Sequence, residues 1–158
     1  MNDFTHIDEK GKIRMVDVSD KEATSRRAVA KGSIYMNREN FEAISEQKVK
    51  KGNVLETARI AGIMAAKKTS NLIPMCHPLA ITHAGIDFSS DADNSAIHIT
   101  AEVSITGQTG VEMEALTAVS IAALTIYDMC KSYDKTMTIS DIALYEKTGG
   151  KSGHFKRE

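Results

Sequence analysis

Residues 97–106 read Ile-His-Ile-Thr-Ala-Glu-Val-Ser-Ile-Thr, a strict alternation of apolar and polar side chains. Residues 83–88, His-Ala-Gly-Ile-Asp-Phe, alternate in the same way, and the turn-rich segment Ser-Ser-Asp-Ala-Asp-Asn at 89–94 lies between the two. Side chains with period two point to opposite faces of a β-strand. The sequence therefore predicts a hairpin with one face packed on helices and the other facing solvent or another subunit.

Two further strands are predicted around this hairpin. Residues 25–36 place most of their apolar side chains on one face, with Val29 as the exception. The last strand begins near Met137, and its apolar pattern changes phase between Ile139 and Ile142. Because one extra residue in a strand produces such a change, we expect a bulge near Asp141.

Helical segments separate these strands. Asn37 is placed to cap a short helix, and Asn53 with Glu56 has the spacing of a capping box at the start of a second. Small residues on several sides of the second helix, including Gly62, predict close packing against two neighbours. A long helix is expected from about Val111 to Tyr133. The order strand, helix pair, strand, strand, helix, strand predicts an α+β fold, a ferredoxin-like sandwich with an antiparallel sheet and helices on one face.

Composition limits the class of protein. With 158 residues, 42% hydrophobic and 26% charged, the chain is expected to form a single domain over 1–158. A net charge of −1 provides no general field for nucleic acid, so no nucleic-acid partner is expected. Residues 1–13 are polar and unpatterned and predict a mobile N-terminal arm, and residues 148–158 form a tail rich in Gly, Ser and Lys.

The cellular location is predicted from three features that the sequence lacks: a signal peptide, a membrane-spanning segment and a set of disulfide-forming cysteines. The first six residues have neither a basic start nor an apolar stretch. The uncharged apolar run at 115–127 is shorter than the roughly 20 residues that span a bilayer. Cys76 and Cys130 are too few for a disulfide scaffold. We expect a soluble, cytoplasmic protein with no membrane partner and reduced cysteines.

Asp128 and Lys131 are the first candidates for chemistry. Three residues apart at the end of the long helix, they share one face. A carboxylate and an ammonium beside a core can exchange protons if burial moves their pKa values toward neutrality. Spacing alone is equally compatible with a surface ion pair, so both interpretations stay open here.

A second candidate lies between Pro74 and Pro78, whose rings restrict the backbone around Met75, Cys76 and His77. Such rigidity suits a histidine that must be aimed at a substrate. Adjacent Cys and His rarely bind one tetrahedral ion, and the chain has no CxxC or HxxxH spacing, so we expect no metal site.

Charged groups near the predicted helix ends complete the candidates. Glu112 and Glu114 in the first turn of the long helix complement its positive end and could accept the N–H groups of a guanine-like edge. Lys and Arg recur just outside the elements, as ordinary solvated groups or as parts of an anion pocket. The tail sequence Gly150-Lys151-Ser152 is not a P-loop, because Tyr145 stands where the earlier glycine is required.

Four stretches together resemble the MoaC family, the cyclic pyranopterin monophosphate synthases of molybdenum cofactor biosynthesis. They are Met15-Val16-Asp17-Val18 running into Thr24-Ser25-Arg26-Arg27-Ala28; residues 67–79, Lys-Lys-Thr-Ser-Asn-Leu-Ile-Pro-Met-Cys-His-Pro-Leu; Gly110-Val111-Glu112-Met113-Glu114-Ala115-Leu116 through Tyr127-Asp128-Met129-Cys130-Lys131; and residues 147–153, Lys-Thr-Gly-Gly-Lys-Ser-Gly. They cover nearly the whole chain in order.

The resemblance implies a specific activity. The family converts 3′,8-cyclo-7,8-dihydroguanosine triphosphate into cyclic pyranopterin monophosphate and releases pyrophosphate, as a lyase. It implies no organic cofactor, and Mg²⁺ enters only as a companion of the triphosphate. It also implies a homo-hexamer, a trimer of dimers with sites between subunits.

The resemblance also implies roles for individual residues. Asp128 and Lys131 would be the acid/base residues. Met75, Cys76, His77, Met113, Glu114 and Glu112 would contact the substrate, and Lys51, Arg26 and Lys67 would hold its phosphates or reacting sugar. Two other classes are kept as alternatives: a non-catalytic nucleotide-binding regulator, and a sheet-surface RNA binder, for which four Phe, four Tyr and no Trp leave few stacking platforms.

Overall fold

The computed structural model describes residues 6–8 and 10–158 and contains one five-stranded antiparallel sheet in the order β2-β3-β1-β4-β5. The strands are β1 Thr24–Tyr35, β2 His83–Asp91, β3 Ala96–Gly107, β4 Thr138–Thr148 and β5 Phe155–Lys156. The helices are α1 Arg38–Ser45, α2 Val54–Lys67, α3 Thr69–Leu72 and α4 Glu112–Cys130. The predicted α+β class and the split β-α-β order are confirmed.

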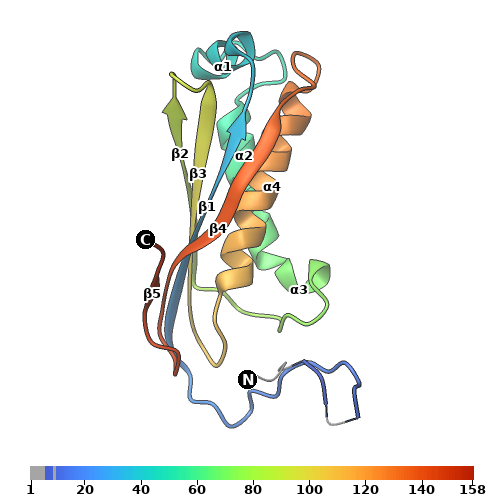
Figure 1. The fold of residues 1–158 in the computed structure, drawn as a ribbon, viewed down its shortest axis with the longest axis vertical. Helices are drawn as coiled ribbons and strands as arrows, with labels where there is room; N and C mark the ends of the chain where they lie inside the picture. The colour runs from blue at the N-terminus through green and yellow to red at the C-terminus, as the bar shows by residue number, and fades with distance from the viewer. Residues whose placement is uncertain (1–5, 9) are drawn as a thin grey trace.

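The helices α2 and α4 lie side by side on one face of the sheet (Figure 1). The core forms between them because the alternating apolar residues of the central strands point to that face. Ile34 of β1 is paired with Ile97 of β3 and with Ile139 of β4, so isoleucines meet across three strands. Val119, Ala123 and Ile126 of α4 are fully buried against them.

The long helix α4 is apolar enough and long enough to cross a membrane by length and composition alone. Here it is the central helix of the core, packed on β1, β3 and β4 beside α2. Gly62 of α2 permits their close approach, since a Cβ at this position would stand 2.8 Å from the Ala118 carbonyl oxygen of α4. The predicted close packing of the second helix is confirmed.

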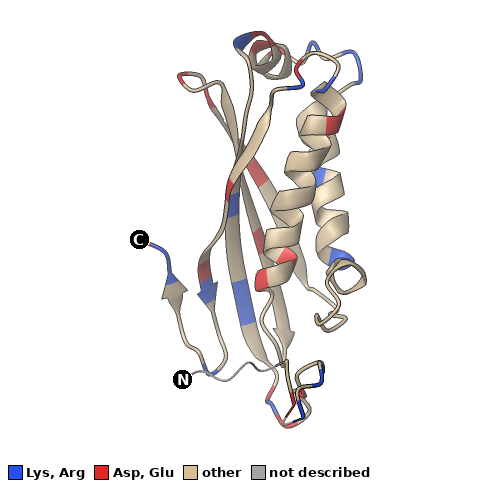
Figure 2. Cartoon of the chain, turned by 45° about the vertical axis from the view of Figure 1, so that its right-hand side comes forward, with Lys and Arg blue, Asp and Glu red and all other residues tan. Residues whose placement is uncertain are grey.

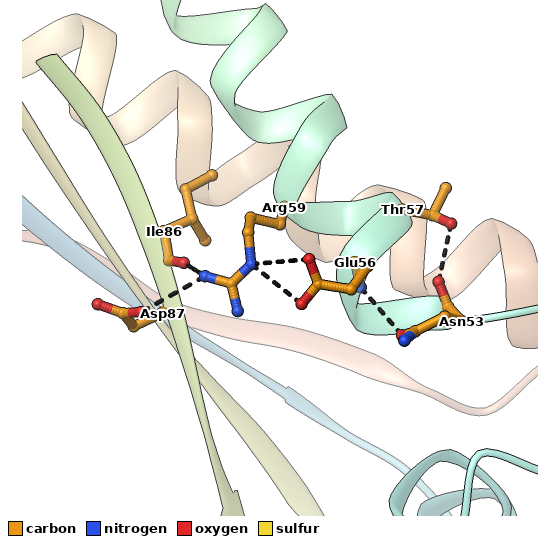
Figure 3. A network of polar contacts seen from close by, with 6 residues as sticks. All are labelled: Asn53, Glu56, Thr57, Arg59, Ile86 and Asp87. Carbon is orange, nitrogen blue, oxygen red and sulfur yellow. Dashed lines mark hydrogen bonds and ion pairs between the residues drawn. The ribbon is translucent and has the colours of Figure 1, made fainter.

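Local signals act as expected at the helix starts. The Asn37 side chain accepts a hydrogen bond from Asn40 N at 2.8 Å, and Asn53 accepts one from Glu56 N at 3.1 Å. The Glu56 carboxylate does not complete a capping box but receives Arg59 Nε at 3.2 Å (Figure 3). The same guanidinium donates to the Ile86 carbonyl, which ties α2 to strand β2.

The ends of the chain add to the predicted layout. The bulge expected in the last strand is confirmed, because the β1–β4 register shifts between Lys31 and Ser33 and Asp141 has φ 59°. The tail predicted after residue 148 returns as β5 and pairs with β4. The predicted N-terminal arm includes residues 1–5 and 9, which lie outside the described residues. Its remainder forms a small turn closed by a bridge between Ile7 and Ile13.

Candidate active site

A cavity of about 540 Å³ lies at the end of the molecule where α4 begins. The strand-to-helix connection and the first turn of α4 form one wall, and the segment after α3 forms another. The cavity is lined by six of the predicted substrate-contact residues: Met75, Cys76, His77, Glu112, Met113 and Glu114. The structure thus brings together two stretches that are more than thirty residues apart in the sequence.

Glu114 is the buried carboxyl group of this cavity, with only 4% of its surface exposed. Loss of hydration, with a smaller contribution from the nearby Glu112 carboxylate, raises its pKa from 4.5 to about 7. The group can therefore exchange a proton near neutral pH, the property required of an acid or base at physiological pH. A sequence shows the glutamate but not this burial.

His77 is held by the N-terminal segment. Its Nε2 lies 2.8 Å from the Val16 carbonyl oxygen, which can only accept a hydrogen bond. Nε2 therefore carries a proton, and in the neutral ring Nδ1 is left as the acceptor. The neighbouring thiol of Cys76 has its pKa raised by burial, with a smaller contribution from Glu114, so it is kept as a thiol.

Metal binding is not indicated by these groups. Over residues 6–8 and 10–158, no cluster of three His, Cys, Asp or Glu side chains is arranged to hold an ion. Cys130 is buried in the core, and burial raises its pKa to about 11.

A second polar cluster lies at the opposite end of α4. Lys131 Nζ is 2.7 Å from Asp128 Oδ1, and Lys51 Nζ donates to the Asp128 carbonyl oxygen at 3.1 Å. Lys51, which the family resemblance assigns to the phosphates or the reacting sugar, thus lies beside the pair. In the single chain, however, both side chains of the pair are more than half exposed. Their hydrogen bond lowers the pKa of Asp128 and raises that of Lys131, so the neutralising shift that burial would produce is not present here.

The two clusters cannot contact one small molecule within a single chain. Glu114 and Asp128 are fourteen residues apart on one continuous helix, a rise of about 21 Å at 1.5 Å per residue. Figure 2 shows charged residues near both ends of this helix with an uncharged stretch between them. The structure therefore divides the predicted site into two parts.

The remaining predicted residues fall into different places. Arg26 lies at the first-cavity end, where its Nε donates to the Gly107 carbonyl at 2.9 Å. Lys67 is exposed at the end of α2 and does not line the first cavity, so its role stays a prediction. Lys147, predicted only as one of several basic residues, lines the first cavity and pairs with Glu112 at 2.7 Å.

The sequence profile of the MoaC family matches residues 15–150, which include both clusters and the segment that binds His77. The chain belongs to the MoaC family. Among its relatives, the protein named cyclic pyranopterin monophosphate synthase from Desulforapulum autotrophicum is 63% identical over 98% of this chain and 95% of its own length. Proteins of the same name from Desulfatibacillum aliphaticivorans and a Thermoanaerobacter species are 60% and 62% identical. The alignments cover 100% and 98% of this chain, and 99% and 98% of the respective relatives. The resemblance inferred from the four stretches is confirmed.

Proposed function

We propose that this chain is a cyclic pyranopterin monophosphate synthase of molybdenum cofactor biosynthesis, a pyrophosphate-releasing lyase. This proposal rests mainly on sequence identity: over nearly the whole chain, relatives of that name are about 60% identical. The substrate is 3′,8-cyclo-7,8-dihydroguanosine triphosphate and the product is cyclic pyranopterin monophosphate. The reaction rearranges rings without net redox change, and it takes place in the cytoplasm.

The first cavity supplies groups that suit the base-derived part of this substrate. The Glu112 and Glu114 carboxyl groups can accept the N–H groups of a guanine-like edge, and the apolar side chains of Met75 and Met113 can pack on its ring faces. His77 offers Nδ1 as an acceptor because Nε2 is bound to Val16. Proton transfers at the ring can then use a carboxyl group whose pKa is about 7.

The second cluster supplies the other proton-transfer groups. Asp128, Lys131 and Lys51 can move protons and offset charge that develops on the sugar and the leaving oxygens. No organic cofactor takes part in this scheme, and Mg²⁺ enters, if at all, bound to the triphosphate.

The complete site requires two chains. Residues Met113, Leu116, Ser120, Leu124, Tyr127 and Lys131 recur every three or four positions, so they share one face of α4. Leu124 is 52% exposed on this face, and the neighbouring α2 has Ile60 and Met64 exposed as well. A second copy packed antiparallel along this face, about a two-fold axis between Ser120 and Leu124, would bring its Lys131 end to the Met113 end of the first chain.

This pairing agrees with the proposed assembly, a homo-hexamer built as a trimer of dimers. Each dimer would contain two identical sites, each made from the first cavity of one chain and the Asp128 cluster of its partner. Asp128 and Lys131 would then be buried in the dimer interface. Their pKa values would change from those in the single chain.

Turnover tests the proposal. The purified protein is incubated with the cyclised guanosine triphosphate, and both pyrophosphate and the cyclic pterin product are measured. We expect both products to form in equal amounts. Saturable binding without release of pyrophosphate would instead identify a nucleotide-binding regulator.

A further inference from the structure

Asp134 is a buried carboxylate that belongs to neither part of the site. It lies in the α4–β4 loop, residues 131–137, and only 4% of its surface is exposed. Among residues 6–8 and 10–158, no Lys, Arg or His forms an ion pair with it. A charge removed from water without such a partner must be stabilised by hydrogen bonds to its oxygens.

Three short hydrogen bonds supply this stabilisation. Oδ1 of Asp134 accepts from Thr136 N at 2.7 Å and from Thr136 Oγ1 at 2.6 Å. Oδ2 accepts from Asn37 N at 2.7 Å, a residue that comes 97 positions earlier in the chain. The Thr136 hydroxyl and then the Asn37 N–H lower the pKa of Asp134, so the carboxylate is ionised at neutral pH.

Asn37 connects this carboxylate to the start of α1. While its N–H donates to Asp134, its side chain accepts a hydrogen bond from Asn40 N at 2.8 Å. Asn40 is almost fully buried, and its Nδ2 donates to Met137 Sδ of the same α4–β4 loop at 3.3 Å. The N-terminal turn of α1 is therefore attached to the α4–β4 loop at two points.

The apolar contacts of α1 do not fix this geometry by themselves. Phe41 and Ile44 bury one side of the helix in the core. Hydrophobic burial is non-directional, and a helix of eight residues is too short to be stable alone. The hydrogen bonds of Asp134 are directional and charge-assisted, so they set the position of the helix start relative to the α4–β4 loop.

The two segments joined by this carboxylate lead directly to the cations of the second cluster (Figure 1). Lys131 is the first residue of the α4–β4 loop, and Lys51 lies in the α1–α2 loop, residues 46–53. Lys51 Nζ reaches across to the Asp128 carbonyl oxygen at 3.1 Å. Both loops consist of turns and irregular backbone, so contacts with other segments fix where their lysines lie.

We propose that Asp134 is a positioning residue for the reaction: by joining the start of α1 to the α4–β4 loop, it holds Lys131 and Lys51 in their working geometry. The catalytic part of these two lysines rests on the proposed function. Asp134 does not touch the substrate and transfers no proton itself. Its effect is large because a misplacement of about 1 Å can reduce a rate by about 10²-fold.

Substitutions at both ends of the carboxylate contact test this role. Asp134→Asn keeps the shape but replaces one acceptor oxygen by a donor, so an N–H or O–H group loses its partner. Thr136→Val removes the hydroxyl contact alone, and Thr136→Ser retains it. Steady-state kinetics with the cyclised guanosine triphosphate measures kcat and KM separately.

The expected result is a selective loss of kcat. It should fall about tenfold or more in Asp134→Asn and by about threefold in Thr136→Val, because the proton-transfer groups lose their alignment. KM should stay within about twofold, since the first cavity that binds the ring is untouched. Thr136→Ser and Asp93→Asn, a control in the exposed turn between β2 and β3, should match the parent.

Hydrogen exchange of backbone amides tests the attachment without turnover. In Asp134→Asn we expect faster exchange at residues 46–53 as well as at 131–137, because freeing the start of α1 also loosens the loop that follows it. Strands β2 and β3 should exchange as in the parent. If circular dichroism shows that Asp134→Asn does not fold, Thr136→Val compared with Thr136→Ser gives the same information.

The outcomes separate this role from the proposed activity. Unchanged exchange at residues 46–53 would overturn the proposal, since the two loops would not be coupled. Loosened loops with a parental kcat, or an increase in KM alone, would overturn it as well. A parent that releases no pyrophosphate would reject the proposed function. Exchange then decides alone: coupled loops support Asp134 as the group that orders Lys131 and Lys51, and uncoupled loops overturn it.

Discussion

Lys147 Nζ lies 2.7 Å from Glu112 Oε1 and so joins the end of strand β4 to the first turn of α4. Both side chains are less than a third exposed, which makes the pair stronger than a fully solvated one. The ammonium offsets the charge of Glu112 beside the buried Glu114. Strand β4 therefore influences the electrostatics of the first cavity.

The pH dependence of stability should reveal Glu114. Its pKa is raised from 4.5 to about 7 in the folded chain, so the folded state retains a proton that the unfolded state loses. Stability should therefore fall as the pH rises from about 4.5 through about 7, since ionising the buried group is costly. Glu114→Gln should remove this loss and gain on the order of 1–2 kcal/mol at pH 8 relative to pH 5. Denaturant melts at both pH values measure it. Parallel pH profiles for parent and variant would contradict the prediction.

Catalysis by the Asp128 cluster is tested by two single substitutions. Lys131→Ala removes a proton donor and Asp128→Asn removes basicity with little change of shape, so turnover should fall by about 10²-fold or more in each. Both side chains are more than half exposed in the single chain, so each variant should still fold, with a thermal midpoint close to that of the parent. Pyrophosphate release and thermal midpoints are measured together. Near-parental turnover in either variant would remove that residue from the mechanism.

If each active site is built from two chains, two different inactive variants should restore activity when they are mixed in one dimer. Lys131→Ala and His77→Ala damage opposite parts of the site, so a mixed dimer would retain one intact site of its two. With random pairing, half the dimers are mixed, and activity should recover to about a quarter of the parental value. Light scattering of the parent should also give a mass several times 17.2 kDa. No recovery after co-refolding, in particles shown to be mixed, would place each site within one chain.

The contact between α2 and α4 predicts a steric effect at Gly62. Gly62→Ala would bring a methyl group to 2.8 Å from the Ala118 carbonyl oxygen, and the helices must separate to accept it. The expected loss is about 1–3 kcal/mol despite the better helix propensity of alanine. Thr57→Ala on the exposed side of the same helix should have a much smaller effect. An increase in melting temperature for Gly62→Ala would show that the packing is looser than described.

Metal content gives an independent check. Cys76 and Cys130 are expected to bind no zinc, and Cys130 is buried in the core. Elemental analysis after exhaustive chelation should find no stoichiometric zinc, with activity retained. Activity that disappears on chelation and returns only with zinc would reverse this assignment.

The sequence by itself determined the main helices and strands and the hairpin of β2 with β3. Alternation over 97–106 predicted strand β3, and the phase change after Ile139 predicted the bulge that the register confirms. Asn37 and Asn53 marked the helix starts, because capping depends only on nearby backbone. The four family stretches likewise identified Asp128, His77 and Glu114 as candidates before any geometry was known.

Only the tertiary structure decided which of these residues lie together. It placed Met75 to His77 beside Glu112 to Glu114, added Lys147, and separated them from Asp128 by most of the length of α4. The single chain also left Asp128 and Lys131 in solvent while it buried Glu114. Local patterns fix which face of an element is apolar, but burial and the pKa of a carboxyl group depend on what distant segments pack over it. The sequence therefore names the reactive groups, and the packing of distant segments sets their protonation.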